Sequence, residues 1–178
     1  MKTVRRRRHF VVRMLSPRAT RGILAVGHLR FRCALGRSGT TASKREGDGA
    51  TPRGSWPLRG ALYRRDRLMR PRSGLALCAI RPADGWCDQP ADRNYNRPVR
   101  LPYPASAEEM WRADDLYDLV VVLGHNDRPR VRGRGSAIFL HVARAGLAPT
   151  AGCVALDRRD AVRLLALVRR GDVIRIGR

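Results

Sequence analysis

The sequence lacks the features that mark a membrane-spanning or disulfide-stapled protein. No uncharged apolar run approaches the roughly 20 residues that a membrane-spanning helix needs. The 178 residues include only 4 cysteines, which are too few for a disulfide scaffold. These cysteines form no CxxC motif and have no HxxxH nearby, so no zinc site is expected. No internal repeat is found either, which excludes a solenoid and favours one globular domain.

Acidic residues and lysines are also scarce. The chain has 37 Lys and Arg residues against 15 Asp and Glu, for a formal net charge of +22, and its only lysines are Lys2 and Lys44. So much positive charge favours an anionic partner, such as nucleic acid or the carboxylates of peptidoglycan. An arginine-rich composition also arises in GC-rich genomes, and the charge by itself does not separate these two interpretations.

The N-terminus is basic, and its first residues have an ambiguous role. Residues 5–8 are four consecutive arginines, as at the charged start of an export signal. Arg13 and Pro17 interrupt the apolar stretch of about 7–15 residues that such a signal requires, so no export signal is convincing. We therefore expect a basic segment at residues 1–9, followed by one domain at residues 10–178 that begins with a strand.

Apolar patterning predicts a mainly β domain with two helices. The first helix is expected at about 106–117, because Ser106 and Glu109 have the spacing of a capping box. The second is expected at about 158–170, where acidic residues open the segment and arginines and Gly171 close it. Short apolar runs predict strands at 10–15, 23–26, 29–35, 75–80, 119–123, 136–142 and 173–176, with a long loop at 36–60 and an irregular excursion at 81–104.

One cysteine lies in a context that suits a nucleophile. Cys153 follows Gly152 in a loop segment, and His141 stands near the end of a predicted strand twelve residues earlier. A nucleophilic thiol needs a base to remove its proton, and a flexible backbone beside it can supply oxyanion donors. A cysteine and a histidine alone are also compatible with two buried structural residues. The pair therefore indicates catalysis only where the surrounding sequence supports it.

Three stretches around this pair resemble the L,D-transpeptidase catalytic domain of the YkuD type. Residues 44–56 resemble the family's glycine-rich signature, K-x-G-D-G-x-T-P-x-G-x-[FYW]. Residues 135–141 resemble the strand that carries the catalytic histidine, and residues 150–154 resemble the nucleophile loop, [S/T]-x-G-C-[V/I]. Residues 84–88 and 94–97 are further similar to a short, single-domain proteobacterial branch. The order and spacing agree, and the resemblance covers nearly the whole chain.

This resemblance implies an L,D-transpeptidase-like β-sandwich with the active site at one end. Cys153 would attack a carbonyl of a donor stem peptide in peptidoglycan, with His141 as its general base. A backbone carbonyl near Gly152 or Thr150 would orient the imidazole, and the Gly152 backbone could also serve the oxyanion. A diaminopimelate amine of an acceptor stem would resolve the thioester and form the cross-link.

The same resemblance implies the setting of the reaction. It requires no metal or other cofactor, and its partners would be the donor and acceptor stem peptides of peptidoglycan. We expect a monomer that works in the periplasm or cell envelope, although the sequence gives no export route.

The chain departs from the family's common nucleophile loop, S-H-G-C-h-R/N, in which h is apolar. Ala151 replaces the histidine, and Ala155 replaces the arginine or asparagine that helps to hold substrate in relatives. Arg144 is therefore a candidate to hold a stem carboxylate bidentately, with a solvated loop arginine as the alternative. The altered loop leaves two products open: the usual 3-3 cross-link, and a 1-3 link between L-Ala and diaminopimelate.

Further substrate contacts are expected from four residues, and rival functions remain open. Thr150 lies beside the nucleophile, and Tyr95, Asn96 and His125 are weaker candidates with packing or turn roles as the alternatives. The other three cysteines are expected to be buried and inert, so an activated Cys153 should alkylate fastest. The rival functions are an L,D-carboxypeptidase that uses water as acceptor, and a non-enzymatic module that binds nucleic acid or another polyanion.

Overall fold

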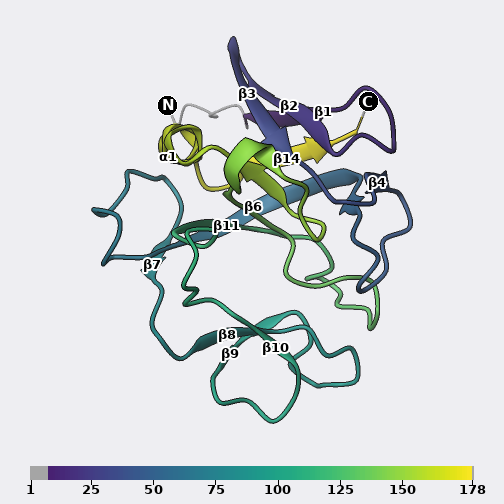
Figure 1. The fold of residues 1–178 in the computed structure, drawn as a ribbon, viewed down its shortest axis with the longest axis vertical. Coiled ribbons are helices and arrows are strands. Elements are labelled where there is room, and N and C mark those ends of the chain that lie inside the picture. The colour runs from purple at the N-terminus through teal and green to yellow at the C-terminus, as the bar shows by residue number, and fades with distance from the viewer. Residues whose placement is uncertain (1–7, 178) are drawn as a thin grey trace, which may run out of the picture.

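Strands make up most of the regular structure in the computed structural model, which describes residues 8–177 (Figure 1). Most of them are short, and many of the segments between them contain glycine or proline. The elements in chain order are β1 (His9–Arg13), β2 (Arg21–Val26), β3 (Leu29–Ala34), β4 (Thr40–Thr41), β5 (Thr51–Pro52), β6 (Gly54–Tyr63), β7 (Leu77–Ala79), β8 (Asp84–Cys87), β9 (Arg97–Arg100), β10 (Ala107–Glu109), β11 (Leu119–Leu123), β12 (Phe139–Val142), the 3₁₀ turn η1 (Ala145–Leu147), β13 (Val154–Leu156), α1 (Arg158–Leu167) and β14 (Val173–Ile176).

The largest sheet runs in the order β11-β12-β13-β3-β2-β1-β14-β6-β7. Strand β6 is long enough to pair with two strands of this sheet, with β14 through residues 54–57 and with β11 through residues 58–63. Because β11 is also the first strand in the order, the second pairing closes the sheet on itself around the main core. The mainly β class predicted from the sequence is therefore confirmed.

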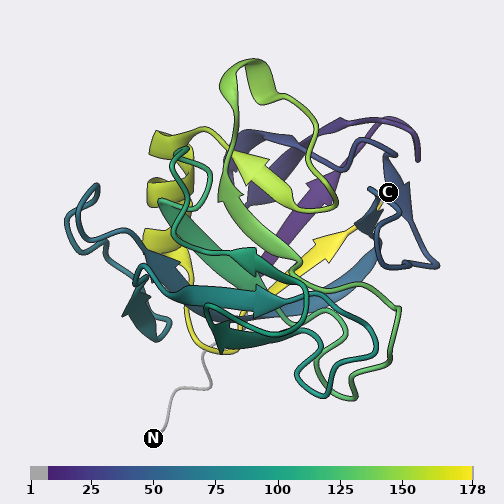
Figure 2. The same cartoon turned by 60° about the horizontal axis from the view of Figure 1, so that its bottom comes forward.

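The main core fills the space enclosed by this sheet and by α1. Inward-facing side chains such as Phe10, Leu24 and Leu156 are fully buried in it. Helix α1 packs against β11, β12 and β13, on one side of the domain in Figure 2. Its N-cap is the Asp157 carboxylate, which accepts a hydrogen bond from the Arg159 N–H at 3.0 Å. Within residues 8–177 no helix has the length and apolar character to cross a membrane.

A second, smaller sheet in the order β10-β8-β9 stands apart from the N- and C-terminal strands, at the bottom of Figure 1. A separate apolar cluster joins it to the large sheet. In this cluster the Trp86 ring of β8 meets the Phe139 ring of β12 edge to face, with centroids 5.1 Å apart. Cys153 and Tyr117 belong to the same cluster, so the junction between the two sheets is where the nucleophile candidate lies.

Several predicted elements are confirmed. The strands expected at 10–15, 23–26, 29–35, 75–80, 119–123 and 173–176 correspond to β1, β2, β3, β7, β11 and β14. The second helix exists but ends at Leu167, because Val168 is buried in an extended conformation and Gly171 follows with φ of +91°. Of the basic segment predicted at 1–9, residues 1–7 lie outside the described residues, and His9 belongs to β1.

The helix predicted at 106–117 is wrong. Its first residues form β10, which pairs antiparallel with β8, and the Met110 N–H donates to the Asp84 carbonyl at 3.0 Å. The spacing of Ser106 and Glu109 reports only local capping potential, whereas the unpaired edge of β8 offers the backbone a set of partners from distant sequence. The rest of the segment forms bends, and the side chains of Arg64 and Arg67 donate hydrogen bonds to its backbone carbonyls.

Three other segments contain different structure from that expected. The predicted loop at 36–60 contains β4, β5 and the start of β6, and the excursion at 81–104 contains the β8–β9 pair. The strand predicted at 136–142 begins only at Phe139, because Ala137 adopts a positive φ of +50°. Alternation within β12 holds, since Phe139 joins the second cluster whereas Leu140 lies in the main core.

Candidate active site

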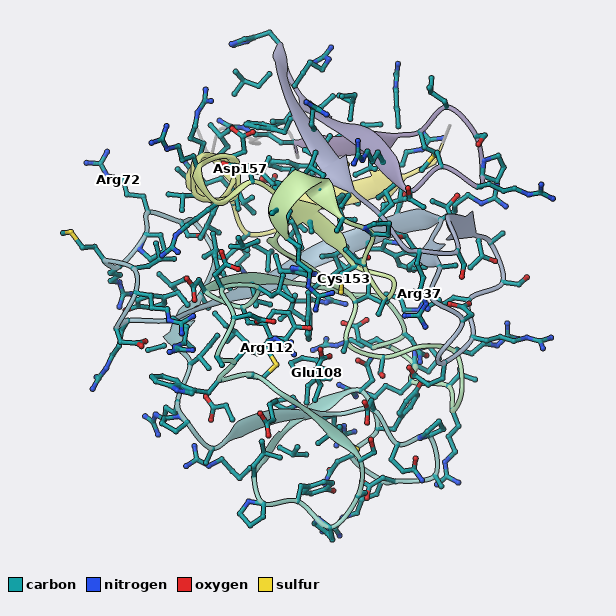
Figure 3. All side chains as sticks on the ribbon, viewed as in Figure 1. Arg37, Arg72, Glu108, Arg112, Cys153 and Asp157 are labelled. Carbon is teal, nitrogen blue, oxygen red and sulfur yellow. The ribbon has the colours of Figure 1, made fainter. Side chains whose placement is uncertain are left out.

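A cavity of about 630 Å³ lies where the small sheet, the large sheet and the loop before β13 meet. Both members of the predicted catalytic pair, Cys153 and His141, line it. Figure 3 shows Cys153 near the middle of the molecule, with Arg112 and Glu108 on the side of the small sheet and Arg37 on another side. The fold thus brings residues from four separate parts of the chain to one concave site.

The Cys153 thiol is buried and hydrogen-bonded to the backbone. Its Sγ accepts from the Phe139 N–H at 3.3 Å and donates to the Ala137 carbonyl at 3.2 Å. Burial, together with the nearby carboxylate of Glu108, raises the pKa of the Cys153 thiol to about 12. At neutral pH the resting group is therefore a protonated thiol, with its hydrogen directed at a carbonyl oxygen.

The His141 imidazole projects from β12 and is also buried. Its Nδ1 lies 2.7 Å from the Val142 carbonyl oxygen, and because a carbonyl can only accept, Nδ1 carries the proton and Nε2 is the basic nitrogen. Burial lowers the pKa of His141 to about 4. The carbonyl that orients the ring is therefore that of Val142, and not one near Gly152 or Thr150 as expected.

The two side chains are both uncharged in the resting site. The thiol bonds to Phe139 and Ala137 rather than to His141, so its hydrogen must turn away from the Ala137 oxygen before the imidazole can accept it. The expectation that Cys153 alkylates fastest is therefore revised, because its thiol keeps its proton in the resting site. A neutral pair in a buried site favours proton transfer in the transition state over a standing ion pair.

This electrostatic state predicts an unusual order of cysteine alkylation. Cys78 is the exposed cysteine of the four, contrary to the expectation that it is buried, and Cys33 and Cys87 are buried with raised thiol pKa values. Iodoacetamide at neutral pH should therefore modify Cys78 first and Cys153 much more slowly, because Cys78 is exposed whereas Cys153 is buried and keeps its proton. Peptide mass mapping over a time course measures these rates. Equal rates at Cys78 and Cys153 would contradict the protonated resting thiol.

The loop that carries Cys153 is held by two threonine hydroxyls. The Cys153 carbonyl accepts from Thr150 Oγ1 at 2.7 Å and from Thr51 Oγ1 at 3.3 Å. Thr150 Oγ1 in turn accepts from the Gly152 N–H at 3.1 Å. Thr150 lines the cavity as predicted, but its hydroxyl serves the loop, and the Gly152 N–H is already engaged there and is not free for an oxyanion.

The glycine-rich stretch at 44–56 packs directly beneath this loop. Lys44 is only 6% exposed and forms an ion pair with Asp48. A β-carbon added to Gly152 would lie 3.2 Å from the Lys44 Nζ and 3.0 Å from the Ala50 carbonyl oxygen, and the φ of Gly152 is +139°. Both the close contacts of an added β-carbon and the positive φ require glycine at this position. Two motifs that are about 100 residues apart in sequence thus form one structural unit.

Asn96 supports the opposite side of Cys153. Its Oδ1 accepts from the Trp86 indole at 3.0 Å and from the Ala137 N–H at 3.1 Å, and its Nδ2 donates to the carbonyls of residues 125–126. The Ala137 carbonyl accepts the hydrogen bond from the Cys153 thiol. By binding the Ala137 N–H, Asn96 therefore fixes the position of the residue that holds this thiol. Asn96 itself does not line the cavity, so the predicted substrate contact is replaced by a positioning role.

Tyr95 and His125 also lie outside the cavity lining. The Tyr95 hydroxyl donates to the Glu46 carboxylate, and Glu46 does line the cavity. The His125 Nε2 lies 2.8 Å from the Arg134 carbonyl, and its ring meets the Trp56 ring edge to face. Both residues therefore use their polar atoms to hold neighbouring loops, and neither is placed as the predicted substrate contact.

Comparison with known proteins decides the family. The model of the YkuD L,D-transpeptidase catalytic domain matches residues 19–176. The chain belongs to this family.

No curated protein sequence matches it significantly. An L,D-transpeptidase from Mycobacterium smegmatis is similar in structure with a TM-score of 0.45 and 12% identity, over 96% of this chain and 58% of that one. L,D-transpeptidase 3 from Mycobacterium tuberculosis gives 0.48 and 14%, over 96% and 61%. The chain thus spans about three fifths of the length of these solved structures.

This YkuD domain contains cavity residues that the sequence motifs do not reveal. Glu108, Arg112 and Tyr117 line the cavity from the segment that was predicted to be a helix. The available signal was weak: Glu108 and Glu109 are the only adjacent glutamates in a chain that is poor in acids. Arg144 lines the cavity as predicted. Within residues 8–177 no three His, Cys, Asp or Glu side chains gather as a candidate metal site.

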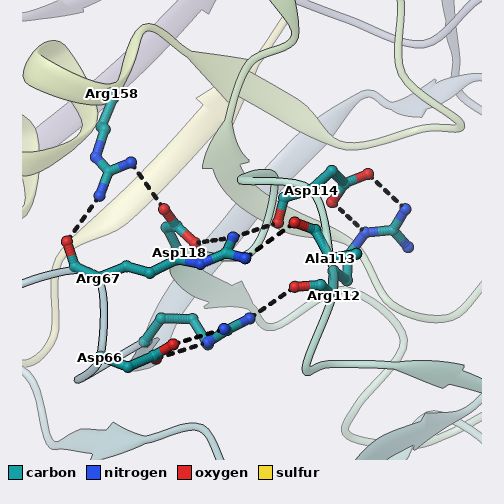
Figure 4. Close-up of polar contacts among 8 residues, drawn as sticks. Asp66, Arg67, Arg112, Ala113, Asp114, Asp118 and Arg158 are labelled. Atoms are coloured by element: carbon teal, nitrogen blue, oxygen red, sulfur yellow. Dashed lines mark hydrogen bonds and ion pairs between the residues drawn. The ribbon is translucent and has the colours of Figure 1, made fainter.

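The wall of the YkuD cavity at residues 112–118 is held by arginines (Figure 4). Asp118 is fully buried, and its carboxylate forms ion pairs with Arg67 at 3.1 Å and with Arg158 at 2.8 Å. Arg64 and Arg67 donate to three backbone carbonyls of the segment at 2.7–2.9 Å. These contacts replace the hydrogen bonds of a regular helix or strand, and so fix Arg112 and Tyr117 on the cavity wall.

Replacing Asp118 with asparagine should destabilise the domain by about 3 kcal/mol, because two arginines lose their buried counter-charge. The matched control is Asp160→Asn, which removes the exposed ion pair to Arg163 and should change the free energy of unfolding by less than about 1 kcal/mol. Urea unfolding of both variants measures the difference. Equal stability of the two variants would show that the arginine network does not hold the wall.

Proposed function

We propose that this chain is a cysteine acyltransferase that cross-links peptidoglycan stem peptides through a thioester on Cys153. The observation that carries the proposal is that Cys153 and His141 line one cavity in a chain of the YkuD L,D-transpeptidase family. A peptidoglycan substrate would place the protein in the cell envelope or periplasm.

The reaction follows from the two neutral side chains. The thiol hydrogen turns from the Ala137 carbonyl to Nε2 of His141 as Sγ attacks the donor carbonyl. The Phe139 N–H, which already bonds to Sγ, stabilises the negative charge that develops on sulfur. The imidazolium then protonates the leaving amine, the C–N bond breaks, and a thioester remains. An acceptor amine attacks this thioester, its C–S bond breaks, and the thiol is restored.

The basic groups of the cavity suit a substrate with several carboxylates. Arg37 and Arg144 line the cavity and take part in none of the ion pairs between described residues. A guanidinium can hold a carboxylate bidentately, so these two arginines are suited to the free carboxylates of stem peptides. Ala151 and Ala155 also line the cavity, and their small side chains support a donor site different from the common one, which leaves both the 3-3 and the 1-3 link as products.

The experiment uses purified protein and muropeptides with diaminopimelate-containing stems, followed by mass spectrometry. New cross-linked dimers, with fragmentation locating the bond, are the expected result. Shortened stems without dimers would favour the carboxypeptidase alternative. No change in the muropeptides, together with salt-dependent binding of DNA, would favour the polyanion-binding module.

A further inference from the structure

Glu108 is a carboxylate on the cavity wall that the two-residue mechanism does not use. It lies on β10, faces the cavity, and accepts a hydrogen bond from the Tyr117 hydroxyl. The Tyr117 ring meets the His141 ring edge to face at 5.4 Å. The carboxylate is also close enough to Cys153 to disfavour the thiolate. Glu108 is therefore a charged group beside both reacting side chains.

Glu108 has no ion-pair partner among the described residues, and only the charge of Arg112 favours its carboxylate from farther away. The nearby guanidinium of Arg112 is committed to Asp114, which it holds through two hydrogen bonds of 2.7 and 2.8 Å. In a chain with 37 basic residues, Glu108 takes part in none of the described ion pairs. An unpaired, half-buried carboxylate is unfavourable in the free protein, which points to a cationic ligand that completes it.

Neighbouring polar atoms also lack partners. Ser136 lines the cavity and is 6% exposed, and its hydroxyl has no hydrogen-bond partner among the described residues. One carboxylate oxygen of Asp88, another lining residue, is likewise buried and unpartnered. Glu46 adds a third acid to this wall. Buried polar atoms without partners in a native cavity are explained if a polar ligand supplies the missing hydrogen bonds.

We infer that Glu108 binds the ammonium group of the acceptor and thereby selects an amine, rather than water, to resolve the thioester. This inference rests on the proposed function. The arginines Arg37 and Arg144 suit carboxylates, whereas Glu108 suits an ammonium. The free end of a diaminopimelate side chain carries one group of each kind, so the two sets of residues match the two charges of one ligand.

In the acceptor step, Glu108 takes up the proton that the ammonium group must lose before it can attack. The bound ammonium transfers one proton to the Glu108 carboxylate and becomes a neutral amine, which attacks the thioester carbonyl. The C–N bond forms and the C–S bond breaks, and the second amine proton passes through His141 to the departing sulfur. Glu108 then returns its proton to solvent. Burial raises the pKa of Glu108, which makes its carboxylate a better proton acceptor than an exposed one.

The test compares Glu108→Gln with Glu109→Gln, an identical substitution at the next residue, which is exposed and lies outside the cavity. With a diaminopimelate stem peptide as acceptor, Glu108→Gln should lower cross-link formation by about 10-fold to 100-fold, the size of a lost charge-assisted hydrogen bond. The thioester adduct should accumulate in intact-protein mass spectra. Glu109→Gln should match the wild type in both measurements.

Two further measurements separate a role in amine binding from a defect in folding. Hydroxylamine, a nucleophile that is largely neutral at neutral pH, should release the thioester at similar rates in Glu108→Gln and wild type. Glu108→Asp, which keeps the charge, should recover part of the transfer to the stem peptide. Equal loss with both acceptors, or equal activity of the two glutamine variants, would overturn the role of Glu108. Absence of any thioester in the wild type would instead overturn the proposed function.

Discussion

Replacing Cys153 with serine should lower acyl transfer by about 10⁴-fold or more while leaving the fold intact. A serine hydroxyl can keep both hydrogen bonds of the thiol, from the Phe139 N–H and to the Ala137 carbonyl. It is much less acidic than a thiol, so the neutral His141 imidazole is too weak a base to generate a comparable nucleophile. Cross-linking rates and intact-protein mass spectra of the acyl adduct provide the measurement.

The matched control for this variant is Cys78→Ser, which alters the exposed cysteine on β7. This control should retain full activity and should lose the fast alkylation that marks the wild type. Cys153→Ala adds a second check, since it removes the nucleophile without adding a hydroxyl. Cross-linking by Cys153→Ala at wild-type rates would assign the nucleophile to another residue and would overturn the proposed mechanism.

The location of Cys153 and His141 in one site could be predicted from the sequence because their motifs are local. The stretches at 44–56 and 150–154 both contain glycine at positions with a positive φ. The positions of these glycines in the sequence therefore indicate the backbone conformation of the two loops. The contact between the two stretches, through Lys44 and Gly152, could not be derived from either alone. Local sequence therefore specified the loops, and the fold of the large sheet determined that they meet.

The wall of the cavity could not be predicted for a different physical reason. Residues 106–117 carry a plausible helix start, but their backbone partners are the edge of β8 and the side chains of Arg64 and Arg67. Those partners are at least about 20 residues away in sequence, and no local propensity contains them. Glu108 was therefore missed as a cavity residue, because a helix assignment gave no reason to place it near Cys153.

The supporting role of Asn96 was missed for a related reason. An asparagine in a polar loop suggests a turn or a ligand contact, whereas here its amide joins three separate segments by four hydrogen bonds. One of these segments contains Ala137, whose positive φ a non-glycine residue rarely adopts. The hydrogen bonds around Ala137 offset the cost of that conformation. They also place the Ala137 carbonyl where it accepts the hydrogen bond from the Cys153 thiol.

Replacing His141 with glutamine should lower acyl transfer by about 10²-fold to 10⁴-fold, the contribution of a general base. A glutamine amide can still donate to the Val142 carbonyl, so the orientation of β12 is kept, but the amide cannot accept the thiol proton. Formation of the thioester adduct should slow by the same factor as cross-linking. Slowing of the acceptor step alone would contradict the assignment of His141 as the base for Cys153.

The same variant should change how the stability of the domain depends on pH. In the folded protein the pKa of His141 is about 4, because burial disfavours the imidazolium, whereas in the unfolded chain it is about 6.5. Between these values the unfolded state binds a proton that the folded state does not, so the free energy of unfolding falls as pH falls. His141 alone accounts for a loss of about 3 kcal/mol over this window. Other titrating groups are common to wild type and His141→Gln, so they cancel in the difference between the two stability profiles. Chemical unfolding from pH 7 to pH 4 should show a steeper loss in the wild type, and parallel profiles would show that His141 is not buried in its neutral form.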